Sequence, residues 1–458
     1  MALFAPHKPR AGIEHLLKAG PGLRHYQLGE LPNRKRVHLR VEADGSGVLV
    51  INASQMAHFN PSAVLMARLL LEQVDDRAAI GVIRKMYNVS QKQASHDFLV
   101  FKGTFFKLVS PDEDACPVCD LNLDSFQPFS RQPSAPYRMD LALTYRCNNL
   151  CAHCYNEASR CGKELTWGDW TRVLDRVWEL GIPHVVFTGG EPTLVKDLPG
   201  LVAHAEGLGL ITGLNTNGRR LSDPAFVDEL VAAGLDHVQI TLESHDPAIH
   251  DRIVGHSGAH KETVAGIRSA LATRLFVMTN TTLLRENSAY LADTLRFLSE
   301  LGVPTIGLNG LIHSGRGAAY TQGLSEDELP DLLQLASGHT AKRGQRLIWY
   351  TPTLYCHFNP LESGLGVKGC TAALYNMCVE PDGGVLPCQS YYQPLGNILS
   401  DAWENIWNHD LAVSIRDRAY APAGCRECDL LSTCGGGCPL YVNSSQAAQP
   451  QPVHALPF

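Results

Sequence analysis

The sequence lacks the features of a membrane protein and those of a nucleic-acid-binding protein. It contains no uninterrupted apolar run near the roughly 20 residues that a membrane-spanning helix needs. Basic residues are not in excess, since 39 Lys and Arg stand against 46 Asp and Glu and the formal net charge is −7. Because a phosphate backbone is bound mainly through clustered positive charge, and no basic stripe stands out, we expect neither a nucleic acid nor a membrane as a partner.

The first residues also lack the apolar core and the small-residue cleavage site of a signal peptide. Hydrophobic residues make up 45% of the chain and charged residues 19%, a composition typical of globular rather than disordered proteins. The 458 residues are enough for roughly two to four domains. We therefore expect a cytoplasmic globular protein with several domains.

Cysteine is abundant, with 14 residues. In a reducing compartment, so many thiols indicate metal binding or redox chemistry rather than disulfides. Most of them fall into three groups along the chain, which are Cys147, Cys151 and Cys154; Cys356, Cys370, Cys378 and Cys388; and Cys425, Cys428, Cys434 and Cys438. Cys116 and Cys119 form a separate pair, and Cys161 stands alone.

Residues 1–110 are predicted to form a small winged-helix-like domain. Segments 36–43 and 47–53 alternate like strands around a turn, and amphipathic segments at 62–73, 75–87 and 90–106 follow them. Two or three strands followed by three helices are typical of that shape. Residues 111–136 are proline-rich and show no sustained periodicity, which predicts a linker.

Residues 137–347 alternate six times between strand-like and helical segments. The predicted strands lie in segments 139–146, 184–190, 211–218, 237–244, 275–284 and 305–312. Such alternation requires a parallel sheet with right-handed crossovers, and six units fall short of the eight that close a barrel. We therefore predict an α/β fold with a partial (β/α)6 barrel, followed by a cysteine-rich domain at 348–440 and a disordered tail at 441–458.

The first cysteine group, Cys147-x3-Cys151-x2-Cys154, directly follows the first barrel strand, where the active sites of such barrels lie. Three thiolates on one short loop can hold three irons of a 4Fe-4S cluster and leave the fourth iron open to a small ligand. The alternative is a structural zinc site in which His153 supplies the fourth ligand. Zinc sites usually repeat a C-x2-C pair, so the spacing favours iron.

This motif, followed by the aromatic Tyr155, resembles the signature of the radical S-adenosylmethionine (SAM) superfamily over roughly residues 137–440. The run Gly189-Gly190-Glu191-Pro192 ends the second predicted strand, where the family contacts the SAM amino group. The resemblance implies that SAM binds the open iron, is cleaved reductively to a 5′-deoxyadenosyl radical, and that this radical abstracts a substrate hydrogen. Further polar residues at strand ends either contact SAM or substrate or are ordinary strand-end residues, namely Asn217, Glu243, Asn309 and Arg316.

The C-terminal cysteines resemble the SPASM extension of peptide-modifying radical SAM enzymes, because Cys370-x12-Gly383-x4-Cys388 precedes Cys425-x2-Cys428-x5-Cys434-x3-Cys438. A zinc knuckle is the alternative for the last four cysteines. The resemblance implies two auxiliary 4Fe-4S clusters, three clusters in all. Their ligands would be Cys356, Cys370, Cys388 and Cys438 for the first and Cys425, Cys428 and Cys434 for the second.

The family pattern continues with one further cysteine, which this sequence lacks. The second auxiliary cluster then has an open site, a non-cysteine ligand such as His454, or a thiolate from Cys116 or Cys119. Cys161 and Cys378 are expected to be small buried residues outside the clusters.

The N-terminal domain resembles, more loosely, the pyrroloquinoline-quinone chaperone-like element that binds leader peptides of ribosomally made, post-translationally modified peptides (RiPPs). The alternative, a DNA-binding winged helix, would need a basic recognition helix, and none stands out. We therefore expect a RiPP maturase that forms a thioether or a carbon–carbon cross-link, with ferredoxin or flavodoxin as electron donor. The alternatives are an enzyme that modifies a small molecule or an enzyme subunit, and a non-catalytic iron–sulfur electron carrier.

Overall fold

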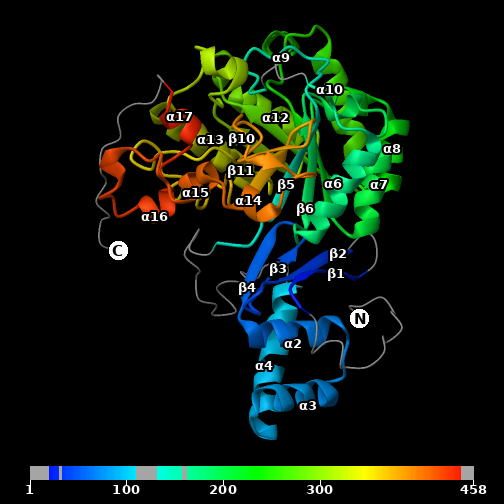
Figure 1. The fold of residues 1–458 in the computed structure, drawn as a ribbon. Coiled ribbons are helices and arrows are strands. Elements are labelled where there is room, and N and C mark those ends of the chain that lie inside the picture. The colour runs from blue at the N-terminus through cyan, green and yellow to red at the C-terminus, as the bar shows by residue number, and fades with distance from the viewer. Residues whose placement is uncertain (1–19, 30–33, 110–131, 157–161, 445–458) are drawn as a thin grey trace. The chain divides into compact units, whose positions relative to one another are not determined.

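The computed structural model describes residues 20–29, 34–109, 132–156 and 162–444 (Figure 1). The chain divides into two compact units, of which unit 1 comprises Met1–Gln127 and Trp178–Pro183, and unit 2 comprises Pro128–Val177 and His184–Phe458. No helix in these described ranges is both long enough and apolar enough to cross a bilayer. The disordered tail expected at 441–458 is wrong at its start, because a helix continues to Val442. Residues 445–458 and most of the expected linker lie outside the described residues.

Unit 1 consists of a small antiparallel sheet and three helices. The strands pair in the order β1-β2-β3-β4, with bounds β1 Gly22–Leu28, β2 Lys35–Val41, β3 Gly47–Ile51 and β4 Gln55–Phe59. The helices are α2 Pro61–Leu71, α3 Asp76–Tyr87 and α4 Gln91–Val109. The three predicted helices are confirmed, and the described sheet has four strands instead of the predicted two or three.

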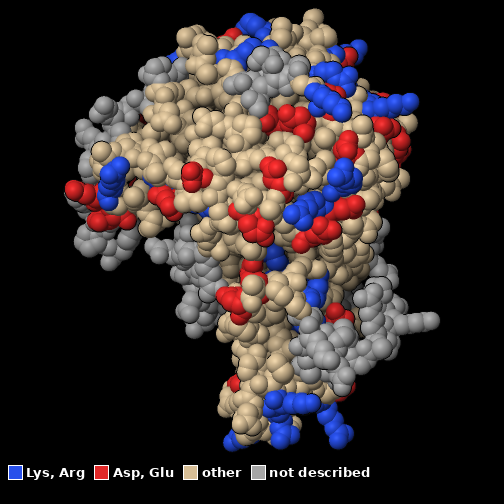
Figure 2. Space-filling model, viewed as in Figure 1, with Lys and Arg blue, Asp and Glu red and all other residues tan. Residues whose placement is uncertain are grey.

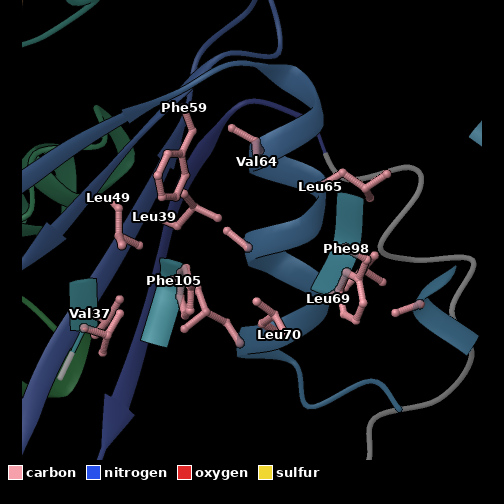
Figure 3. Packing of buried hydrophobic residues seen from close by; sticks show 14 of the residues in the cluster. Val37, Leu39, Leu49, Phe59, Val64, Leu65, Leu69, Leu70, Phe98 and Phe105 are labelled. Atoms are coloured by element: carbon pink, nitrogen blue, oxygen red, sulfur yellow. The ribbon is translucent and has the colours of Figure 1, made fainter. Parts of the chain in front are cut away.

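The core of unit 1 lies between the sheet and its helices (Figure 3). Leu39 and Leu49 from neighbouring strands, Leu69 from α2, and Phe98 and Phe105 from α4 are all almost fully buried. Every buried side chain of this cluster lies between residues 28 and 109. Unit 1 therefore has a hydrophobic core of its own, as an independently folding domain requires.

Unit 2 contains the predicted partial barrel. Its parallel strands are β5 Arg138–Thr144, β6 His184–Gly189, β7 Ile211–Thr216, β8 His237–Thr241, β9 Phe276–Thr282, β10 Thr305–Asn309 and β11 Arg346–Trp349. The long helices between them are α6 Trp167–Glu179, α7 Leu198–Leu208, α8 Pro224–Ala233, α9 Pro247–Val254, α10 Ala259–Leu271, α12 Leu291–Glu300 and α13 Leu329–Lys342. The six predicted units are confirmed, and β11 adds a seventh parallel strand.

The cysteine-rich region continues the same sheet instead of forming a separate one. Strand β12 (Asn376–Val379) pairs in parallel with β5, and β13 (Gly384–Leu386) and β14 (Gly396–Asn397) follow in antiparallel pairing. The resulting ten-stranded sheet runs from β11 to β14 without closing. Four short helices complete the region, α14 Trp403–Trp407, α15 Asp410–Arg416, α16 Leu431–Cys434 and α17 Pro439–Val442.

The barrel strands have one apolar and one polar face. In β8, the buried Val238 and Ile240 alternate with the half-buried Gln239, and β9 repeats this pattern with Val277 buried and Asn280 half-buried. Successive side chains on a strand point to opposite faces, so the apolar set packs under the helices and the polar set lines the concave side. On the face of unit 2 seen in Figure 2, acidic and basic side chains are interspersed.

Candidate functional site

The first cysteine group lies on the loop that follows β5, here called the cluster loop and comprising residues 145–156. Cys147 is exposed, whereas Cys151 and Cys154 are partly buried. The backbone N–H of Cys154 bonds the carbonyl of Cys151 at 3.3 Å, so the last two cysteines share one tight turn. Parallel strands bring their carboxyl ends to one edge, where catalytic loops of such barrels gather.

Two neighbouring loops fix the backbone of the cluster loop. Arg219, two residues after Asn217, donates from Nη1 to the Asn148 carbonyl at 2.6 Å and to Asn149 Oδ1 at 2.9 Å. Arg316 donates from Nε to the Cys151 carbonyl at 2.9 Å. Arg316, expected near the cofactor, therefore holds the loop that carries the cysteines.

Burial governs the protonation of the cluster-loop thiols. It raises the pKa of Cys147 to about 11, and it raises the pKa of Cys151 well above that of an ordinary thiol, with the neighbouring Cys154 adding to the effect. Metal ligands must be thiolates, so binding of iron here releases protons.

The Gly-Gly-Glu-Pro segment at the end of β6 packs directly against the start of the cluster loop. Gly189 has φ +128°, and a Cβ there would lie 2.2 Å from the Thr144 carbonyl oxygen; a Cβ on Gly190 would lie 2.3 Å from the Arg146 carbonyl oxygen. Only glycine permits such an approach of two backbones. The two glycines therefore hold the two motifs side by side.

Glu191 is fully buried and bound by the protein itself. Its Oε1 accepts hydrogen bonds from the hydroxyls of Thr193 and Thr216, both at 2.6 Å, and its Oε2 accepts from the backbone N–H of Asn217 at 2.8 Å. Burial raises its pKa, and these donors oppose the rise. The carboxylate thus joins the ends of β6 and β7.

Asn217 and Glu243 also contact the cluster loop. The side chain of Asn217 donates to Asn148 Oδ1 at 2.7 Å. Glu243, at the end of β8, pairs through Oε1 with His153 Nε2 at 3.1 Å and accepts the backbone N–H of Thr282 through Oε2 at 2.9 Å. Since Nε2 of His153 faces this carboxylate, only Nδ1 remains for a metal in the zinc alternative.

Several buried polar atoms on the barrel strands have no hydrogen-bond partner within the protein. Asn309 donates from Nδ2 to the Gly310 carbonyl at 2.9 Å, while its Oδ1 has no partner within the protein. Asp140 Oδ2 and Asn280 Oδ1 are likewise buried without a partner. Buried acceptors are normally satisfied, so these atoms fit a polar ligand with hydroxyl or amino donors, as SAM is.

Cys370, Cys388 and Cys438 form the first C-terminal set. Burial raises the pKa of each, and the charge of the neighbouring Cys370 adds to the rise at Cys388 and at Cys438. Backbone N–H groups oppose the rise, that of Ala372 at Cys370, for example, and that of Ser390 at Cys388. Thiolates that ligate iron–sulfur clusters are tuned by hydrogen bonds of this kind, so the set fits such a cluster.

Cys425, Cys428 and Cys434 form the second set. Burial raises the pKa of Cys425, and the neighbouring Cys434 and Cys428 raise it further. The backbone N–H of Tyr355 bonds Cys434 Sγ at 3.4 Å. The next residue, Cys356, packs into a small apolar cluster that contains Cys425. The family resemblance implied that Cys356 belongs to the first set, whereas its packing lies with the second.

Three consecutive glycines separate the two sets. Gly435, Gly436 and Gly437 all have positive φ, at 70°, 76° and 73°. This left-handed run turns the chain so that the N–H groups of Gly436 and Gly437 bond the sulfur of Cys434. It lets residues four apart, Cys434 and Cys438, serve different sets.

Cys378 is buried in a small core with Ala142 and Leu386. Cys116, Cys119, Cys161 and His454 lie outside the described residues. Within the described ranges, no three His, Cys, Asp or Glu side chains converge as ligands of a single metal ion.

Sequence reasoning missed Arg219, Tyr145, Asn156 and Tyr392, which lie at or against the cluster loop. Tyr155 is partly buried, which raises the pKa of its phenol, and the neighbouring Cys154 adds to the rise. Arg219 could have been found as a basic residue directly after a strand-end Asn-Gly turn. Tyr145, Asn156 and Tyr392 bond partners far away in sequence, and no local sequence pattern predicts such contacts.

Two family models match the chain. The Radical SAM superfamily model matches residues 141–298, and the model of SPASM, an iron-sulfur cluster-binding domain, matches residues 370–429. These segments contain the GGEP motif with the cluster loop and most of the C-terminal cysteines.

Curated relatives match over most of their length. The chain is 31% identical over 336 residues to the PqqA peptide cyclase of Gluconobacter oxydans (strain 621H), covering 71% of this chain and 92% of that protein. It is also 31% identical over 318 residues to the PqqA peptide cyclase of Xanthomonas axonopodis pv. citri (strain 306), covering 66% and 82%.

Solved structures share the fold. Streptococcus suis SuiB bound to its precursor peptide SuiA matches with a TM-score of 0.68 and 17% identity, over 91% of this chain and 97% of SuiB. AnSMEcpe with bound AdoMet and a Kp18Cys peptide matches with a TM-score of 0.55 and 16% identity, over 69% and 92%. From these matches, the chain belongs to the radical SAM superfamily and is a radical SAM enzyme with a C-terminal SPASM domain.

Proposed function

We propose that this enzyme is a peptide maturase, which forms a thioether or carbon–carbon cross-link in a ribosomally made precursor peptide. The observation that carries the proposal is the alignment with a peptide cyclase over 92% of that relative's length. Because the alignment spans nearly the whole relative, it includes more than a shared cofactor-binding motif. The open, polar concave side of the barrel supports a substrate of this kind.

Cys147, Cys151 and Cys154 would hold a 4Fe-4S cluster with one open iron. When bound there, the cluster supplies the electron that cleaves SAM to methionine and a 5′-deoxyadenosyl radical. Gly189, Gly190, Glu191 and Pro192 would hold the amino end of SAM, and Tyr155, Asn217, Glu243 and Asn309 would line the cofactor site.

The chain's own residues keep this site rigid. Arg219 and Arg316 hold the loop backbone through its carbonyls, and the His153–Glu243 pair holds its centre. A reactive radical needs its substrate hydrogen within contact distance, so fixed loops favour the intended reaction over side reactions.

The SPASM region would hold two auxiliary 4Fe-4S clusters, giving three in all. Cys370, Cys388 and Cys438 would bind the first, and Cys425, Cys428 and Cys434 the second. The second would be completed by Cys356, by a thiolate of Cys116 or Cys119, or by a non-cysteine group, or it would be left open. A small electron-transfer protein such as ferredoxin or flavodoxin would supply the reducing electron.

The test of this function is SAM cleavage by the reduced, anaerobically reconstituted protein. We expect 5′-deoxyadenosine and methionine from the unaltered enzyme and none from the Cys147→Ala/Cys151→Ala/Cys154→Ala variant, which should keep its auxiliary iron. The matched control is Cys378→Ala, a buried cysteine outside all three sets, which should still cleave SAM. Cleavage at full rate by the triple variant would overturn the assignment of the cluster loop.

A further inference from the structure

The sheet places the auxiliary hairpin beside the strand that leads into the cluster loop. Strand β12 pairs with β5 so that Cys378 lies opposite Asp140 and Val379 opposite Leu141. The turn after β12 reaches the cluster loop as well, because the hydroxyl of Tyr145 donates to Glu380 Oε1 at 2.9 Å. Segments more than 200 residues apart in sequence are thus held together by a hydrogen bond at this edge.

Tyr392 makes the second contact between these regions. Its ring packs edge-on against Tyr145, with ring centroids 6.1 Å apart and an interplanar angle of 72°. Its hydroxyl donates to Asn156 Oδ1 at 2.9 Å. Asn156 is the last residue of the cluster loop, two positions after Cys154.

Asn156 also contacts the GGEP motif. Its Nδ2 donates to the carbonyl oxygen of Gly189 at 2.7 Å. Because a carbonyl can only accept, Nδ2 must face Gly189, and Oδ1 is then the atom left for the Tyr392 hydroxyl. The Gly189 oxygen has a second lone pair, which a ligand donor can use.

Tyr392 also lies close in sequence to a cysteine of the first auxiliary set. It lies four residues after Cys388, and the backbone N–H of Tyr391 bonds the Cys388 carbonyl at 3.2 Å. From the segment that follows Cys388, contacts therefore run through Tyr392 and Asn156 to Gly189.

We infer that Tyr392 and Asn156 are positioning residues that set the Gly189 carbonyl for SAM from the auxiliary side of the enzyme. The inference rests on the proposed SAM contact at Gly189. Loss of the Tyr392 hydroxyl leaves Asn156 free to rotate, so the carbonyl loses its fixed direction while all cluster ligands stay in place. SAM affinity therefore depends on a residue of the auxiliary region that does not itself touch SAM.

The test compares Tyr392→Phe with Tyr391→Phe in the reconstituted full-length enzyme. Both variants lose one phenolic oxygen from the segment that follows Cys388, but only the Tyr392 hydroxyl bonds Asn156. We expect the Kd for SAM, from titration followed by the EPR spectrum of the reduced protein, to rise about fivefold in Tyr392→Phe and to stay unchanged in Tyr391→Phe. Iron content and Tm should match the unaltered enzyme in both.

A double-variant comparison separates positioning from a general structural role. In an Asn156→Ala background, Tyr392→Phe should cause no further loss of SAM affinity, because its effect passes through Asn156. The inference would be overturned if Asn156→Ala and Tyr392→Phe lowered SAM affinity by independent factors that multiply. Equal Kd values for SAM in the two tyrosine variants would overturn it as well. Failure of the unaltered enzyme to bind SAM would instead overturn the proposed function.

Discussion

At the scale of single residues, Glu191 is a motif residue whose carboxylate also joins two strand ends. Both of its carboxylate oxygens are engaged by Thr193, Thr216 and Asn217. The resemblance implied a residue that contacts SAM, and the geometry adds a tie between two strand ends. A buried carboxylate with several donors tolerates no exchange of an oxygen for an N–H group, because that group would face another donor.

Glu191→Gln should therefore weaken SAM binding without removing iron. The amide places an N–H against the backbone N–H of Thr193 or against that of Asn217, at a cost of about 1–3 kcal/mol. We expect at least about a fivefold rise in the Kd for SAM, measured by titration of the reconstituted protein. The matched control is Glu229→Gln on the exposed face of α8. A Kd equal to that of the control would show that Glu191 does not organise the site.

At the scale of elements, strands with strong periodicity were predictable and weak ones were not. The six barrel strands alternate clearly with helices, so their segments could be located from sequence. Strand β11 is four residues long, and β1 is half-buried along most of its length, so neither gives a contrasting pattern. The pairing of β12 with β5 depends on the assembled sheet, and no local signal in either segment specifies it.

The residues of the site likewise divide into those that the sequence predicts and those that only the fold reveals. The spacing within the cluster loop and the GGEP segment was visible because these residues are neighbours in sequence. The bonds of Tyr392 to Asn156 and of Arg219 to Asn148 join distant segments, so only the fold reveals them. The assignment of Cys356 belongs here as well, since the family resemblance and the packing favour different sets.

Packing leads us to expect that Cys356 serves the second auxiliary cluster. It lies beside Cys425, and the preceding residue bonds Cys434. Cys356→Ala should therefore lower the iron content by up to about a third, the share of one cluster in three. Its Mössbauer and EPR spectra should resemble those of Cys425→Ala rather than those of Cys370→Ala. Spectra that match the Cys370→Ala variant would return Cys356 to the first set.

At the scale of the whole molecule, unit 1 has a hydrophobic core and a sheet of its own. Its core is built only from its own residues, and β1 and β4 are the edge strands of its described sheet. Edge strands present unpaired N–H and C=O groups, which an extended peptide can pair with. The SuiB fold match covers 91% of the chain, a share that includes residues of unit 1.

We therefore expect a fragment of residues 1–115 to bind the leader of the precursor peptide by itself. Backbone pairing along a sheet edge gives affinity without the barrel, so its Kd by calorimetry should be close to that of the full chain. Circular dichroism should first show that the fragment is folded, as its self-contained core requires. The matched fragment, residues 136–458, keeps the cysteine sets of the barrel and SPASM region and should not bind the leader. Equal binding by that second fragment would place leader recognition in unit 2 and leave unit 1 without the proposed role.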